Sequence, residues 1–152
     1  MMTTFETMEF FGIRNAVALI AGLIIGIERT ISGHSAGIKT LVFVSIGSCL
    51  FASMSFYLHD LYPSTDPTRI IGQEITGIGF LGAGVIFYNK LKLNGLTSAA
   101  MIWCVCSLGI IAGSGLIIIP IFASITLVIV ALALKRFEKF IEKFEKTPHE
   151  KE

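Results

Sequence analysis

The sequence predicts an all-α fold, a polytopic membrane helix bundle of about five transmembrane helices with a short amphipathic C-terminal helix. Hydrophobic residues make up 53% of the 152 positions and charged residues 15%, against about 25% charged in an ordinary soluble domain. Of the 23 charged residues, 11 lie in the last 18 positions, so the rest of the chain is almost free of charge. Five stretches also reach the length of about 20 mostly apolar residues that a bilayer-spanning helix needs.

The predicted spans are separated by short breaks rich in Gly, Ser, Pro and charge, and they cover residues 10–27, 38–58, 70–88, 96–113 and 116–134. Arg14 interrupts the first span, close enough to one end to extend its head group to the interface. Glu6 and Glu9 occupy the region where a signal peptide would be positive, and no small-residue cleavage motif precedes Glu28. We therefore expect the first segment to be a retained span.

Basic residues predict the orientation, because cytoplasmic loops of membrane proteins carry an excess of Lys and Arg. The first loop holds Arg29 and Lys39, the third holds Lys90 and Lys92, and the tail holds six more. These ten fall on one side, which predicts a multi-pass inner (plasma) membrane protein with its N-terminus outside and its C-terminus in the cytoplasm. The expected surroundings are the lipid bilayer, with no nucleic acid, since the net charge is only +1.

The chain divides into a transmembrane domain, residues 10–134, and a charged cytoplasmic tail, residues 135–152. In the tail, apolar side chains recur at helical spacing at Phe137, Phe140, Ile141 and Phe144, with Lys and Glu on the other face. Two interpretations stay open. The tail is either an amphipathic helix that continues the fifth span along the inner interface, or a charged stop-transfer flank without a further role.

Glycines are concentrated in the spans. Residues 77–82 match GxGxxG, but no strand precedes them and no βαβ unit follows, so a nucleotide site is not expected. Small residues let helix backbones approach closely in lipid, which predicts tight bundle packing. The predicted helix-packing glycines are Gly22, Gly26, Gly77, Gly79, Gly82, Gly84, Gly109 and Gly113. A second interpretation is that the glycine-rich third span bends or unwinds to line a pathway.

Glu74 is the most informative single residue, because it lies one turn inside the third span, beside Gln73 and after Arg69. A carboxylate at the centre of a membrane helix costs about 2.5–3.5 kcal/mol on insertion scales, so Glu74 is not expected to face lipid. Three interpretations stay open: a structural pair with Arg69 or Arg14, coordination of a cation, or titration as a proton-linked switch.

The remaining polar candidates lie at predicted span ends. Asp66 and Pro67 are a good N-cap and first helical residue for the third span, and Thr97 is an N-cap-type residue for the fourth. Glu28, Arg29 and Lys39 flank the first loop, where the cations serve topology. No catalytic group, cofactor site or metal site can be assigned from the sequence, and no enzyme activity is expected.

Several segments together resemble the membrane domain of the MgtC/SapB family. The residues that carry the resemblance are 22–29, 36–42, 66–70 running on through 77–86, and 95–100 with Trp103 and Gly109. Lys39 is a departure, since family members commonly have Arg there. The resemblance covers most of residues 10–134. It is to the membrane domain of the family only, without the C-terminal ACT-like domain that many members add.

The resemblance implies a bacterial inner-membrane protein linked to magnesium limitation, acid or related stress. From it we expect a regulatory or accessory protein that acts through other membrane proteins or a homo-oligomer. The alternative is a small carrier or channel for a cation, Mg²⁺ or proton-linked, that uses Glu74. A magnesium-transport ATPase role is unsupported, because the sequence has no phosphate-binding loop.

Overall fold

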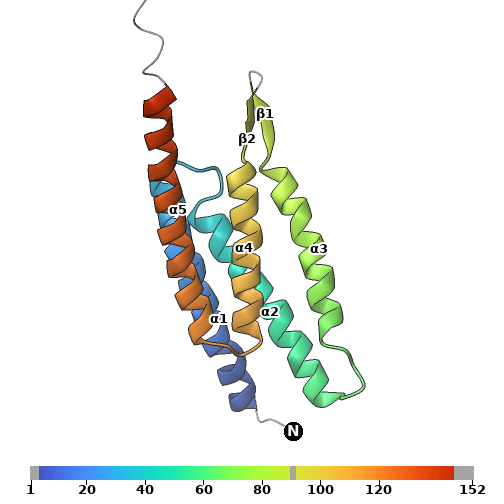
Figure 1. Cartoon of the computed structure of the whole chain (residues 1–152). Helices are drawn as coiled ribbons and strands as arrows, with labels where there is room; N and C mark the ends of the chain where they lie inside the picture. The colour runs from blue at the N-terminus through green and yellow to red at the C-terminus, as the bar shows by residue number, and fades with distance from the viewer. Residues whose placement is uncertain (1–3, 90–91, 146–152) are drawn as a thin grey trace, which may run out of the picture.

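The structure, a computed structural model, describes residues 4–89 and 92–145, and five helices run up and down beside one another in it (Figure 1). This confirms the predicted all-helical bundle. The helices are α1 (Thr4–Ile31), α2 (Ile38–Leu61), α3 (Thr68–Gly84), α4 (Leu96–Gly113) and α5 (Ile118–Glu145). Four of them, α1, α2, α4 and α5, are long and apolar enough to cross a membrane.

The third predicted span, residues 70–88, ends too late. Helix α3 stops at Gly84, and the chain then forms a short antiparallel hairpin of β1 (Phe87–Asn89) and β2 (Lys92–Asn94), with Phe87 opposite Asn94. The apolar run continues from the helix into the first strand, so hydropathy alone does not mark the boundary. With 17 residues, α3 is about 25 Å long, somewhat shorter than a bilayer core of about 30 Å.

Helix α4 begins at the hairpin, and Gly95 makes this junction. Its φ is +89°, in the left-handed region that favours glycine, and an added Cβ would overlap the backbone of Val85. Gly95 therefore takes the N-cap position, with no side-chain cap. Thr97, predicted as an N-cap-type residue, lies instead in the first turn of α4.

Helix α5 continues without interruption from Ile118 to Glu145, so the predicted amphipathic segment continues the fifth span. Pro120 lies in its first turn, where a missing N–H breaks no helical hydrogen bond. Residues 146–152 of the predicted tail lie outside the described residues, as does Lys90.

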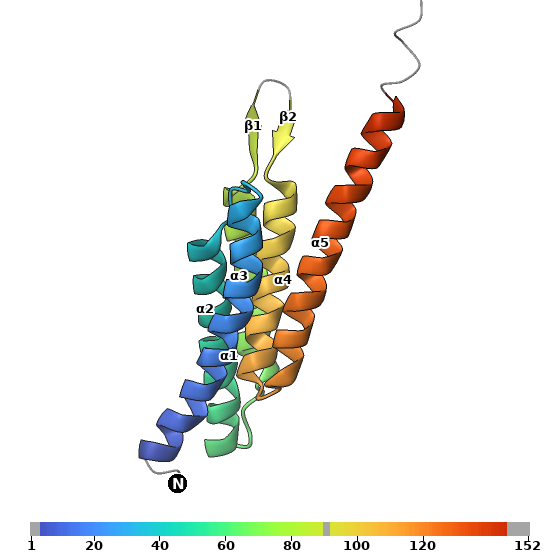
Figure 2. The same cartoon turned by 90° about the vertical axis from the view of Figure 1, so that its left-hand side faces the viewer.

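Helices α2 and α4 form the centre of the bundle, with α3 along one edge and α5 along the other (Figures 1 and 2). Helix α2 packs against both α1 and α4, while α5 contacts α1 and α4. The main core joins side chains of four helices, among them Ile25, Leu41, Ile78, Ile102 and Val105.

The connections divide between the two ends of the bundle. The α1–α2 loop, the hairpin and the end of α5 lie together, at an end we call the hairpin end (Figure 1). The N-terminus, the α2–α3 connection and the α4–α5 connection lie at the opposite, N-terminal end (Figure 1). This arrangement brings Arg29, Lys39 and Lys135 to the same end, as the distribution of basic residues predicts.

Candidate functional site

A groove of about 600 Å³ runs between α2 and α3. Its walls are mostly apolar and include the exposed Phe43 and Phe51 of α2. Its polar side chains come from both helices and are Thr40, Ser48, Gln73 and Glu74. The groove therefore offers a carboxyl group within an apolar surface on the side of the bundle.

Among these polar groups, the carboxyl group of Glu74 has contacts to both α2 and α4. The Cys106 thiol of α4 donates to its Oε1 over 3.9 Å, and the Ser48 side chain of α2 lies beside the same carboxyl group. Its Oε2 is buried and has no hydrogen-bond partner among the described residues. A buried carboxyl oxygen without a hydrogen-bond partner destabilises the folded protein. A ligand, a proton or a side chain of a partner would relieve this by binding at Oε2.

Helical periodicity places Glu74 in this position. Ile78 and Gly82 follow it at i+4 and i+8, on one face of α3, and both are buried. Gly82 faces α4, since an added Cβ would lie in ordinary contact with it, 3.7 Å from Cβ of Ala99. Glu74 therefore lies on the packing face of α3, toward α2 and α4.

The predicted cation partners of Glu74 lie elsewhere. Arg14 stacks over the Phe10 ring at 3.5 Å and donates a hydrogen bond to the carbonyl of Gly113 at the end of α4. Its head group therefore lies at the end of α4, beside the α4–α5 connection. Arg69 is exposed in the first turn of α3. The structure thus pairs Glu74 with neither arginine, which leaves the cation and proton interpretations open.

The predicted packing glycines fall into two groups. An added Cβ at Gly26 would lie 2.8 Å from Cα of Ile38, and one at Gly113 would lie 2.6 Å from Cβ of Ala52. At Gly22 the nearest atom to an added Cβ is Cα of Val42 at 3.0 Å, and at Gly109 it is the carbonyl oxygen of Ser45 at 2.3 Å. These four glycines therefore let α1 and α4 pack tightly on α2.

The glycines Gly77, Gly79 and Gly84 of α3 do not make such close contacts. An added Cβ at Gly77, Gly79 or Gly84 would meet nothing within 4 Å, so close packing inside one copy of the chain does not explain these three residues. Helix α3 is also continuous from Thr68 to Gly84, without the internal unwinding that the second interpretation considers.

At the hairpin end, Glu28 and Arg29 form an ion pair whose two residues are 8% and 2% exposed. Glu28 also accepts a hydrogen bond from the Ser32 hydroxyl at 2.8 Å, and Lys135 donates to the same hydroxyl at 3.2 Å. The sequence predicts that Arg29 serves topology, and the structure in addition buries it in this ion pair. Lys39 is exposed and fits the topological role.

A second, polar cavity of about 310 Å³ lies between the α1–α2 loop, the hairpin and the start of α4. It is lined in part by His34, Ser35, Thr97 and Ser98, and the Ser35 hydroxyl donates to that of Ser98 at 3.0 Å. Burial and the charge of Arg29 lower the pKa of His34.

At the N-terminal end, the N-cap of α3 is Pro67 and the helix begins at Thr68, one residue later than the sequence predicts, but the Asp66 side chain still accepts hydrogen bonds from the first turn. Its Oδ1 accepts hydrogen bonds from the Thr68 backbone N–H at 2.9 Å and from the Thr68 hydroxyl at 2.7 Å. These bonds lower the pKa of Asp66. The role of Asp66 is therefore to start the helix, and it lies outside the groove around Glu74.

Sequence reasoning missed the neighbours of Glu74. Ser48 and Cys106 are 26 and 32 residues away in the sequence, and nothing local connects them to it. The one available signal is the presence of buried hydroxyls in α2, where Ser45 and Ser48 are one turn apart. Among the described residues, no group of three His, Cys, Asp or Glu side chains is placed to hold a metal ion.

Comparison with known proteins fits this picture. A family model described as MgtC family matches residues 16–140. A protein of Escherichia coli K12 named "Putative magnesium transporter YhiD" is 40% identical over 129 residues, which is 82% of this chain and 60% of that protein. "Protein MgtC" of Brucella abortus is 34% identical over 127 residues, which is 84% of this chain and 52% of that protein.

The chain thus spans about half to three-fifths of the length of the curated relatives it matches. No solved structure matches it. The family model covers α1 from Ala16 through most of α5, including both walls of the groove and Glu74. On this evidence the chain is a membrane protein that belongs to the MgtC family.

Proposed function

We propose that this protein is a regulatory or accessory component of the bacterial inner membrane, which acts on another membrane protein during adaptation to low magnesium, acid or related stress. Its basic hairpin end lies in the cytoplasm and its N-terminus outside, in keeping with the distribution of Lys and Arg. The printed names of the relatives, a putative magnesium transporter and MgtC proteins, support the link to magnesium.

The observation that carries the proposal is the groove between α2 and α3. It opens on the side of the bundle, and Gly47 and Gly77, which line it, have nothing within 4 Å of an added Cβ. Small residues along a groove allow another helix to approach closely within the membrane. The carboxyl group of Glu74 supplies a polar contact to such a helix, where hydrogen bonds between helices add about 1–2 kcal/mol in model peptides.

The test uses two glycines of the same helix. Gly77 lines the groove, whereas Gly72 does not, and both have open space around an added Cβ. Gly77→Leu fills the groove, and Gly72→Leu is the matched control. Each variant is expressed in a bacterium that lacks its own family member, and growth is measured in medium limited in magnesium, with membrane content checked by blotting.

We expect Gly77→Leu to lose the growth benefit and Gly72→Leu to keep it. Equal growth of both variants, at equal amounts of protein in the membrane, would show that the groove is not the site of action. Gly82→Leu is a poor choice for this test, because Gly82 packs against Ala99 and its replacement would disturb the fold.

A carrier for magnesium or protons is the second candidate, favoured by the unpartnered Oε2 of Glu74 within the groove. An ionisable residue at membrane depth is a recurrent feature of ion and proton pathways. Its test is uptake by purified protein in liposomes. Uptake that is lost in Glu74→Gln supports the carrier, and lack of uptake by the wild-type protein excludes it.

A further inference from the structure

Helix α5 extends beyond the ends of the other helices at the hairpin end, about as far as the hairpin itself (Figure 2). The Nζ atom of Lys135 reaches the hydroxyl of Ser32, just after α1 ends at Ile31, and this contact marks the level at which the bundle ends. The ten residues from Arg136 to Glu145 continue as a helix for about 15 Å. We call this segment the α5 extension.

One face of the α5 extension is strongly apolar. Phe137, Phe140, Ile141 and Phe144 are between 48% and 65% exposed, and the rings of Phe140 and Phe144 lie 4.7 Å apart, centre to centre. Helix α5 has 28 residues, about 42 Å, whereas a bilayer core is about 30 Å thick. Part of this face therefore lies beyond the hydrocarbon, where large apolar side chains need a cover.

The apolar face does not end at the extension. Moving toward the start of α5 in steps of three or four residues, the same stripe continues through exposed positions, namely Ala133, Val130, Thr126, Phe122 and Ile119. The opposite side of the helix faces the bundle, where Pro120 and Ser124 are fully buried. One exposed stripe thus runs along the whole helix. A partner that binds the stripe within the membrane can therefore also cover the α5 extension.

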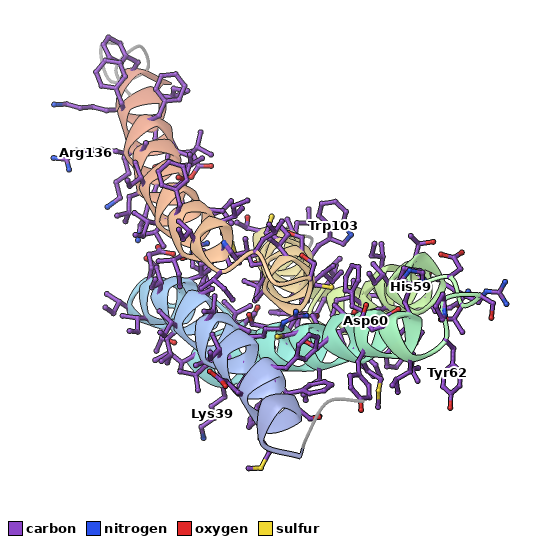
Figure 3. All side chains as sticks on the ribbon, turned by 90° about the horizontal axis from the view of Figure 1, so that it is seen from below. Lys39, His59, Asp60, Tyr62, Trp103 and Arg136 are labelled. Carbon is purple, nitrogen blue, oxygen red and sulfur yellow. The ribbon has the colours of Figure 1, made fainter. Side chains whose placement is uncertain are left out.

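The charges beside the stripe are sorted by sign. Successive residues are about 100° apart around a helix, which places Arg136 and Lys143 on one flank of the stripe and Glu138 and Glu145 on the other. Figure 3 shows Arg136 projecting from the side of α5. The extension therefore has a basic flank and an acidic flank on either side of an apolar face.

This pattern fits a second copy of the same helix. When two identical helices face each other in parallel, the basic flank of each meets the acidic flank of the other, and opposite charges across such a seam set orientation and partner choice. In an antiparallel pair, like charges would meet. Two copies of a chain in one membrane have the same orientation, so their α5 helices are parallel. Anionic lipid headgroups, in contrast, would repel the acidic flank.

We propose that two copies of this chain associate side by side through α5, with the α5 extensions paired in parallel on the cytoplasmic side. The apolar face supplies the buried seam, and the sorted charges select the parallel arrangement. The pairing is independent of the groove between α2 and α3, because α3 and α5 lie on opposite edges of the bundle (Figure 1).

Disulfide cross-linking in native membranes tests the proposal. Phe140→Cys places a thiol on the apolar face, and Lys139→Cys, its neighbour, places one on the far side of the helix. The wild-type protein, whose three cysteines lie within the bundle helices, gives the background. After mild oxidation, we expect dimers of Phe140→Cys on a non-reducing gel at about tenfold the yield of Lys139→Cys. Equal yields from both variants, or none from Phe140→Cys, would overturn the proposal.

Charge reversal gives a second test, on the Phe140→Cys background. Arg136→Glu with Lys143→Glu makes both flanks acidic, and we expect the yield of dimer to fall about fivefold. Adding Glu138→Lys and Glu145→Lys restores opposite flanks at the original net charge, and the yield should return. Failure of this restoration, together with quenching of a fluorophore at position 140 by brominated lipid, would mean that the membrane surface covers the face instead.

Discussion

The guanidinium of Arg14 in α1 donates a hydrogen bond to the carbonyl oxygen of Gly113, the last residue of α4. The same carbonyl accepts a hydrogen bond from the Ser53 hydroxyl of α2 at 3.3 Å, so three helices meet at this point. The end of a helix carries partial negative charge, which a cation stabilises. Arg14 therefore joins α1 to the end of α4, and this explains a charge within the first predicted span.

Replacing Arg14 by Met should destabilise the bundle by about 1–3 kcal/mol, because it leaves the α4 terminus without its cation and removes the stacking on Phe10. The measurement is unfolding by SDS in mixed micelles, followed by circular dichroism. Arg69→Met is the control, since Arg69 is exposed, and it should change stability by less than about 0.5 kcal/mol. Equal effects of the two substitutions would argue against the role given to Arg14.

The glycines that pack on α2 should be intolerant of even one methyl group. Gly113→Ala would place a Cβ 2.6 Å from Cβ of Ala52 and 2.6 Å from the carbonyl oxygen of Cys49, so we expect a loss of about 1–3 kcal/mol. Gly72→Ala meets open space and should be neutral or stabilising by up to about 1 kcal/mol, since alanine favours the helix. The same unfolding measurement compares the two, and similar results would contradict the close packing.

The cap at Asp66 predicts a dependence on pH. Hydrogen bonds from Thr68 lower the pKa of Asp66 in the folded state, so its contribution is complete above the unfolded pKa of about 4. That contribution is lost as the pH falls through the lower, folded pKa. The difference in melting temperature between the wild-type protein and Asp66→Ala should therefore shrink below about pH 4. Asp66→Asn keeps an acceptor oxygen but does not titrate, so the difference in melting temperature between Asp66→Asn and Asp66→Ala should not depend on pH. A pH dependence of that difference would contradict this cause.

The proposed orientation predicts which residues a membrane-impermeant maleimide reaches from outside the cell. Thr65, exposed in the α2–α3 connection, should be labelled in intact spheroplasts when replaced by Cys. Lys39→Cys, exposed at the hairpin end, should be labelled only after the membrane is opened. The wild-type protein gives the background from its own cysteines, and the reverse pattern would invert the topology.

Local features of the sequence predict helix positions well where glycines bracket them. The predicted fourth span, residues 96–113, matches α4 at both ends, because Gly95 and the Ser114–Gly115 pair interrupt the apolar run. The end of α3 could not be predicted in this way, since Phe87 and Tyr88 are as apolar as the helix before them. Hydropathy describes the preference of side chains for apolar surroundings. It does not distinguish the last turn of a helix from an apolar strand.

The candidate site was predictable in its central residue and not in its surroundings. Glu74 is identified by the cost of a carboxylate in a membrane segment, which the sequence shows directly. Its neighbours depend on how α2 and α4 pack against α3, and no local pattern contains that information. The same holds for the partners of Arg14 and Arg29, which no local pattern of the sequence identifies. Tertiary packing instead gives Arg14 a helix terminus and Arg29 a buried ion pair with Glu28.

Ion flux through the purified protein tests the central claim most directly. The wild-type protein and Glu74→Gln are reconstituted in liposomes that contain a magnesium-sensitive dye or a pH-sensitive dye, with an ionophore as the positive control. If the protein acts on a partner, neither form should carry magnesium or protons above empty liposomes, while the wild-type protein still restores growth at low magnesium. Flux by the wild-type protein that disappears in Glu74→Gln would contradict the regulatory role and establish a carrier.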